Sequence, residues 1–195
     1  CSGGGGRFDA GMLYYTPQIW CSDNTDAIDR TKIQYGTSFG YPVSAVGAHV
    51  SAVPNHQTGR SVSIDTRGVV AMSGSFGYEL DLGKVSEAEK NTIKEQIKTF
   101  KGLYYRLSDP YKDPVAAWEF VSKDGDDVLV NVVCLKMHGN MQPLYVRFKG
   151  LNENVTYKDV KTGKIYPAEA LMNIGMPFMP ELGEYQSWQV ELKRC

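Results

Sequence analysis

The sequence lacks the features that mark several common classes of protein. Its four cysteines, at positions 1, 21, 134 and 195, form no Cys-x-x-Cys pair and lie near no histidine cluster, so we expect no zinc site. The net charge is -1 and no basic run exceeds two residues, which argues against a nucleic-acid partner. No apolar stretch approaches the ~20 residues needed to span a bilayer, so we expect no membrane partner.

Phosphate-binding motifs are also missing, although four glycines occupy positions 3–6. A P-loop would need Gly-Lys-Ser/Thr where Gly6 is followed by Arg7 and Phe8, and a G-x-G-x-x-G fingerprint starting at Gly3 would end on Phe8. Glycines are costly to order, and they suit sharp turns or the close approach of a ligand. A ligand other than phosphate, or a structural turn, therefore remains open for this run.

What is present is the composition of a globular protein, with 42% hydrophobic and 22% charged residues. Scattered cysteines in a chain of this length favour a reducing compartment over a disulfide scaffold, so the expected location is cytoplasmic. The chain does not begin with Met, and its Cys-Ser-Gly opening does not resemble a signal peptide. We therefore expect it to be an interior segment of a longer protein.

The first half alternates short apolar runs with helical patterns. The strand candidates are residues 18–21, 43–46 and 76–82. The helix candidates are a segment through Ile28, Tyr35 and Phe39 with Asn24 or Thr25 as N-cap, and a segment opened by the capping box at 86–89 with Ile93, Ile97 and Phe100 as its apolar stripe. Strands alternating with helices are typical of a β/α barrel or another parallel α/β fold.

From residue 103 onward the apolar residues alternate with period two. The strand candidates are 103–107, 116–122, 128–136, 144–149, 156–160 and 186–192, with one short helix over 168–174. Asp-Gly-Asp at 124–126 and Thr-Gly at 162–163 are typical of hairpin turns. Short strands at this spacing predict an antiparallel β-sandwich. The predicted domains are thus an α/β part over 1–102 and an all-β domain over 103–195.

Candidate chemistry lies where strands of the first half end, because active sites of β/α barrels lie at the carboxyl ends of their strands. Asp23 follows a buried apolar run, and a partly apolar site would raise its pKa and suit it to general-acid catalysis. The alternative, which spacing alone favours, is that Asp23, Asn24 and Asp26 only cap the next helix. For His49 and His56 an ordinary hydrogen-bonding role is the expectation.

The run CSGGGGRFD at 1–9, followed by SDNTD at 22–26, resembles the catalytic region of the microbial α-galactosidases of glycoside hydrolase family 36. The resemblance is dense over residues 1–60 and continues through VAMSGSFGYELDL at 70–82. It extends more loosely through AWEFVS and ALMNIGMPF toward the end of the chain. The pairing of the first two motifs is highly specific.

This resemblance implies the end of a (β/α)8 TIM barrel followed by an antiparallel β domain. It places Asp23 on the general acid/base, and Cys1 and Gly4 on a loop that holds the galactose ring. Such a loop lets backbone N–H groups approach sugar hydroxyls without interference from a Cβ. The implied substrates are α-galactoside oligosaccharides of the raffinose or melibiose type, with no metal ion or organic cofactor. Members of the family are often homo-oligomers.

The resemblance also implies a nucleophilic aspartate in a Lys-x-Asp motif, and no Lys-x-Asp occurs in these 195 residues. We therefore expect a C-terminal fragment of a retaining α-galactosidase that is inactive when isolated. A second departure is Cys21, which stands where Thr or Ser is expected. Two alternatives stay open. In the first, the chain is a carbohydrate-binding module without catalytic activity. In the second, residues 103–195 form a purely structural β domain.

Overall fold

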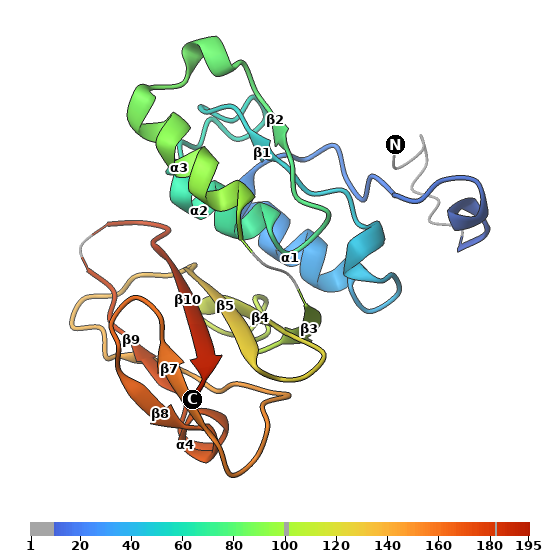
Figure 1. Cartoon of the computed structure of the whole chain (residues 1–195). Coiled ribbons are helices and arrows are strands. Elements are labelled where there is room, and N and C mark those ends of the chain that lie inside the picture. The colour runs from blue at the N-terminus through green and yellow to red at the C-terminus, as the bar shows by residue number, and fades with distance from the viewer. Residues whose placement is uncertain (1–9, 100–101, 182) are drawn as a thin grey trace. The chain divides into compact units, whose positions relative to one another are not determined.

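A computed structural model describes residues 10–99, 102–181 and 183–195. The chain divides between Lys98 and Thr99 into two compact units (Figure 1). Cys1 and Gly4, the expected sugar-binding residues, lie outside the described residues. No helix in the described ranges is long and apolar enough to cross a membrane.

The first unit repeats the order of parallel strand and helix. Its helices are α1 (Ala27–Thr37), α2 (Ile64–Ala71) and α3 (Glu87–Ile97), its strands are β1 (Val50–Ser51) and β2 (Tyr78–Glu79), and its 3-10 helices are Ala10–Tyr14, Val43–Ala45 and Leu82–Lys84. Strands β1 and β2 pair in parallel, and Ile19 forms a parallel bridge with Val46. The α/β order predicted for this half is confirmed.

Helix α3 begins as its sequence predicts. The Ser86 hydroxyl accepts a hydrogen bond from the Glu89 N–H at 3.3 Å, and the Glu89 carboxylate accepts one from the Ser86 N–H at 3.0 Å. This reciprocal capping box satisfies two N–H groups that the helix itself leaves unpaired. Ile93 of the predicted apolar stripe is buried, but Ile97 is exposed, so the stripe is wrong at that position.

The first unit differs from the sequence-based expectation in one strand and in one further helix. Residues 43–46 are not a strand, because the Ala45 N–H donates to the Pro42 carbonyl at 2.9 Å and closes a 3-10 turn, leaving only Val46 to pair. Helix α2 was not predicted at all. It lies between α1 and α3 (Figure 1), and it contributes Ile64 and Ala71 to a core shared with Val50 and Ile93.

The second unit is an antiparallel β domain, as predicted. Its strands are β3 (Leu103–Arg106), β4 (Val115–Val121), β5 (Asp127–Cys134), β6 (Leu144–Val146), β7 (Thr156–Asp159), β8 (Ile165–Pro167), β9 (Met176–Phe178) and β10 (Ser187–Arg194), with one helix, α4 (Ala168–Asn173). Six of them form a sheet in the order β3-β4-β5-β10-β7-β8, and β6 and β9 form a second sheet. All of these pairs are antiparallel.

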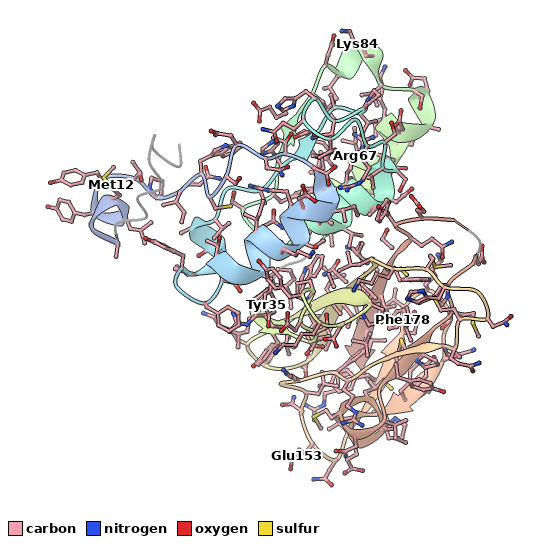
Figure 2. All side chains as sticks on the ribbon, turned by 180° about the vertical axis from the view of Figure 1, so that it is seen from behind. Met12, Tyr35, Arg67, Lys84, Glu153 and Phe178 are labelled. Atoms are coloured by element: carbon pink, nitrogen blue, oxygen red, sulfur yellow. The ribbon has the colours of Figure 1, made fainter. Side chains whose placement is uncertain are left out.

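The two sheets share one hydrophobic core, which makes this unit a small sandwich. Val130 and Leu192 of the larger sheet pack in the same cluster as Val146 and Phe178 of the smaller one (Figure 2 labels Phe178). The predicted hairpin between β4 and β5 is also present, where Gly125 has a φ of 78° in the turn. Only the short strands β8 and β9 were not predicted.

Candidate active site

Asp23 lies on the segment that joins the parallel bridge at Ile19 to helix α1. Its side chain is exposed, and the described residues give it neither a hydrogen bond nor an ion pair. The partly apolar surroundings expected for this carboxylate are therefore not formed by the described part of the chain. An accessible carboxylate at the end of a strand segment, with no partner in the described ranges, can contact a ligand.

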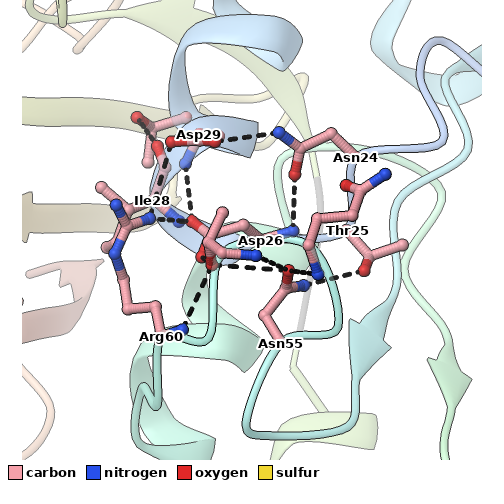
Figure 3. A network of polar contacts seen from close by, with 10 residues as sticks. Asn24, Thr25, Asp26, Ile28, Asp29, Asn55 and Arg60 are labelled. Carbon is pink, nitrogen blue, oxygen red and sulfur yellow. Dashed lines mark hydrogen bonds and ion pairs between the residues drawn. The ribbon is translucent and has the colours of Figure 1, made fainter.

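Asp26, and not Asp23, is the N-cap of α1. Its buried carboxylate accepts hydrogen bonds from the N–H groups of Ile28 at 2.9 Å and Asp29 at 3.0 Å. It also accepts one from the Thr58 hydroxyl at 2.7 Å and pairs with the Arg60 guanidinium (Figure 3). Because these groups satisfy Asp26 fully, the capping role that spacing favoured belongs to Asp26 alone, and it is wrong for Asp23.

Asn24 and Thr25, the predicted caps, have other partners. The Asn24 amide donates to Asp29 at 2.9 Å, and its side-chain oxygen accepts from the Asp26 N–H at 2.9 Å. The Thr25 hydroxyl accepts from the Asn55 amide at 3.0 Å (Figure 3). The Asn24 bonds tie the chain to the start of α1 and the Thr25 bond ties it to the loop between β1 and α2, so the chain is fixed on that side of the carboxylate.

A cavity of about 210 Å³ opens at the same ends of the parallel strand segments. It is lined by Thr25, Ser51, Ala52, Pro54, His56 and Glu79. Ser51 and Glu79 are the last residues of β1 and β2 and are partners in the parallel register. Thr25, two residues from Asp23, follows the segment that pairs at Ile19. The cavity and Asp23 therefore belong to the carboxyl edge of consecutive strand segments, where barrel enzymes bind substrate.

The cavity lining suits a neutral ligand that carries hydroxyl groups. The Ser51 hydroxyl lies below the cavity surface, where it is buried and has no hydrogen-bond partner among the described residues. The Glu79 carboxylate accepts hydrogen bonds and repels anions. No group of three or more His, Cys, Asp or Glu that could hold a metal ion occurs in the described ranges.

His49 has a structural position. Its ring stacks on Trp20 with centroids 4.5 Å apart, and its Nε2 lies 3.0 Å from a carboxylate oxygen of Glu79. Burial lowers the pKa of His49 against the opposing effect of Glu79, so the ring is neutral at pH 7. These contacts agree with the ordinary hydrogen-bonding role predicted for His49. His56 lines the cavity.

Ser51 and Glu79 were not among the residues singled out from the sequence. In the sequence, Glu79 lies inside the predicted strand at 76–82 and Ser51 lies between predicted elements, and the parallel register brings them together. The sequence did contain a signal for a strand here, because apolar Ala48 and Val50 alternate with polar His49 and Ser51. That alternation marks a short strand and would have placed Ser51 at its end.

Two protein families match the chain, one in each half. The family described as Melibiase matches residues 1–106. The family described as Glycosyl hydrolase family 36 C-terminal domain matches residues 115–192.

Individual relatives resemble the whole chain. It is 58% identical over 206 residues to the bifunctional alpha-galactosidase/sucrose kinase AgaSK of Mediterraneibacter gnavus, covering 100% of this chain and 22% of that protein. The galactosidase domain of AgaSK superposes with a TM-score of 0.93 at 56% identity, covering 99% of this chain and 28% of that one. A variant of the alpha-galactosidase AgaA from Geobacillus stearothermophilus, in complex with raffinose, gives 0.91 at 48% identity with the same coverage. The chain thus spans about a quarter of the length of these relatives.

Proposed function

Because the chain belongs to the melibiase family of glycoside hydrolase family 36, we propose that it is part of a retaining α-galactosidase that removes terminal α-galactosyl groups from oligosaccharides. Family membership confirms the resemblance and the fold class, which is the end of a catalytic barrel followed by an antiparallel β domain. The observation that supports the proposal most is Asp23, an exposed carboxylate without a partner among the described residues, at the same strand edge as a polar cavity.

In the proposed reaction Asp23 is the general acid and then the general base. It first gives a proton to the glycosidic oxygen as the bond to the anomeric carbon breaks, and an aspartate outside these 195 residues forms the galactosyl-enzyme. Asp23 then takes a proton from the water that releases galactose. Retaining enzymes need these two carboxylates about 5–5.5 Å apart, and the mechanism uses no metal ion or organic cofactor.

For the substrate we propose α-galactosides of the raffinose or melibiose type. Relatives of this chain have been solved with raffinose and with stachyose, which supports this substrate class. Cys1 and Gly4 hold the galactose ring in this proposal, on the strength of the family resemblance. Glu79 lies at the strand edge, where its exposed carboxylate would accept hydrogen bonds from hydroxyls of the same substrate.

A carbohydrate-binding module without catalysis is the rival function, and the substitution Asp23→Asn in the full-length protein separates the two. Asparagine keeps the shape of Asp23 but cannot deliver a proton. Because proton transfer contributes about 10²–10⁴-fold, kcat/KM for raffinose falls by that factor. For a dinitrophenyl α-galactoside, whose leaving group needs no protonation, kcat/KM stays within about threefold.

Asp65→Asn is the matched control, because Asp65 is an exposed carboxylate in the first turn of α2. It leaves kcat/KM unchanged for both substrates. Equal activity of Asp23→Asn and the parent protein on raffinose would contradict the acid/base role. Sugar binding by a full-length protein that turns over neither substrate would favour the binding module.

A further inference from the structure

Arg30 of helix α1 is a buried cation that binds backbone carbonyls instead of a carboxylate. Only 3% of the residue is exposed. Its Nη1 donates to the Ser22 carbonyl at 3.2 Å, and its Nη2 donates to the Gly47 carbonyl at 2.6 Å. Nη1 also lies 3.3 Å from the Cys21 Sγ. The guanidinium thus joins the segment after Ile19 to the segment after Val46, and these two segments pair in parallel.

This placement is energetically expensive. Burial lowers the pKa of Arg30, and no carboxylate pairs with it among the described residues, whereas Arg60 and Arg67 both have acidic partners. The Trp20 ring, whose centroid is 5.9 Å from the Arg30 guanidinium carbon, offsets part of the cost of burying such a charge. A residue kept at such a cost suggests a task other than stability.

The two carbonyls determine what Arg30 fixes. The Ser22 carbonyl belongs to the peptide unit that leads directly into Asp23. The Gly47 N–H donates to the Ile19 carbonyl at 2.8 Å, so Gly47 is already bound to the strand segment that precedes Asp23. A Cβ on Gly47 would lie 2.8 Å from the Trp20 ring, so only glycine allows this close approach. Arg30 therefore holds the peptide before Asp23 against the neighbouring strand segment.

Asp23 depends on its backbone for its position. Its own side chain has no partner among the described residues, while Asn24 and Thr25 are fixed on the far side by the bonds described above. On the near side, Arg30 supplies the hydrogen bond to the peptide that leads into Asp23. We propose that Arg30 is a positioning residue for Asp23, which sets the direction from which the carboxylate approaches the glycosidic oxygen. This inference rests on the proposed function.

The test uses Arg30→Lys and Arg30→Met in the full-length protein, with kcat/KM measured for raffinose and for a dinitrophenyl α-galactoside. Lysine keeps the charge, but its single ammonium lacks the fork that reaches both carbonyls, and methionine keeps only the length. Misplacing a catalytic group by about 1 Å costs on the order of 10²-fold. We expect about a 10–100-fold loss on raffinose for both variants, and less than about a threefold loss on the dinitrophenyl substrate.

Arg67→Lys is the matched control. Arg67 is also buried and donates to two backbone carbonyls, those of Val62 at 2.9 Å and Ser51 at 2.7 Å, but neither belongs to the Asp23 segment (Figure 2 labels Arg67). Any loss in this control is the same for both substrates, because Arg67 does not orient the proton donor. A selective loss in the Arg30 variants, absent from the control, supports the proposal.

Three outcomes overturn the inference. They are an equal loss on both substrates in the Arg30 variants, no loss on either substrate, and failure of both Arg30 variants to show cooperative thermal unfolding, which would make Arg30 a folding residue. These outcomes are distinct from failure of the proposed function. If Asp23→Asn loses raffinose activity selectively and the Arg30 variants do not, the acid/base assignment stands and only the positioning role falls.

Discussion

Glu119 is the residue whose burial and charge are in strongest conflict. Its carboxyl group is fully buried in β4, where one oxygen accepts a hydrogen bond from the Lys149 N–H at 2.6 Å and the other has no partner among the described residues. Burial raises the pKa of Glu119 to about 8. The folded protein therefore holds this proton up to a higher pH than the unfolded chain does, where the pKa is near 4.5.

The consequence is a loss of stability with rising pH. Between pH 4.5 and about 8 the folded state binds more protons at Glu119 than the unfolded state, so the free energy of unfolding falls by up to about 1.4 kcal/mol per pH unit. Glu119→Gln keeps the neutral shape and removes this loss. Urea unfolding of the full-length protein at pH 5 and pH 8 measures it.

Glu153→Gln, at an exposed position, is the control and keeps the parent's pH dependence. An unchanged pH dependence in Glu119→Gln as well would show that Glu119 is ionised in the fold.

Single residues also mark how far the sequence could locate the site. Ser22-Asp23-Asn24-Thr25-Asp26 offers five side chains that can all cap a helix, so spacing alone cannot tell the cap from a free carboxylate. The distinction depends on Thr58 and Arg60, which reach Asp26 from a distant loop. A tertiary contact therefore separates the two aspartates, and their order in the chain does not reveal it.

At the scale of elements, the contact between α2 and α3 reverses the usual effect of replacing glycine in a helix. A Cβ on Gly68 would lie 2.1 Å from the amide of Gln96, a buried side chain that donates to the Ile64 carbonyl at 3.1 Å and accepts from the Tyr78 hydroxyl at 2.7 Å. Gly68→Ala gains about 1 kcal/mol of helix propensity. It breaks two hydrogen bonds worth about 0.5–1.5 kcal/mol each, and it leaves buried polar groups without partners. We expect a net loss of about 1 kcal/mol.

Gly36→Ala in α1 is the matched control for this prediction. No atom lies within 4 Å of a Cβ at that position, so alanine stabilises the helix by about 0.5–1 kcal/mol. Thermal unfolding of the full-length protein gives both shifts. A stabilising effect of alanine at both positions would contradict the packing of α2 against α3.

Elements with a complete local signal were predictable, and those defined by tertiary contacts were not. Helix α3 carries its own capping box, and the β4–β5 hairpin carries its own turn. Helix α2 is buried on nearly all sides, so its residues show no alternation of apolar and polar faces. Strands β8 and β9 are three residues long and contain proline, which is unusual inside a sheet.

At the scale of the whole molecule, the two halves differ in their ability to fold alone. Residues 103–195 enclose one core between two sheets, so we expect this half to be soluble and to unfold cooperatively. Among the described residues of 1–102, the parallel pairing is limited to the two-residue strands β1 and β2 and the bridge at Ile19, and an incomplete barrel of this kind leaves strand edges open. Separate expression of the halves, followed by thermal unfolding, tests this. A cooperative transition for 1–102, or none for 103–195, would contradict the proposed domain boundary.

Azide tests most directly whether Asp23 is the acid/base of a retaining α-galactosidase. In the full-length Asp23→Asn variant with a dinitrophenyl α-galactoside, the galactosyl-enzyme forms but water lacks its base. Azide needs no deprotonation, so it restores turnover. Nuclear magnetic resonance of the product identifies the anomer. We expect α-galactosyl azide, because formation of the galactosyl-enzyme inverts the α-galactoside and attack by azide inverts it again, so the product keeps the substrate's configuration. Formation of the β-azide would make Asp23 the nucleophile, and no rescue by azide would contradict its role as the base.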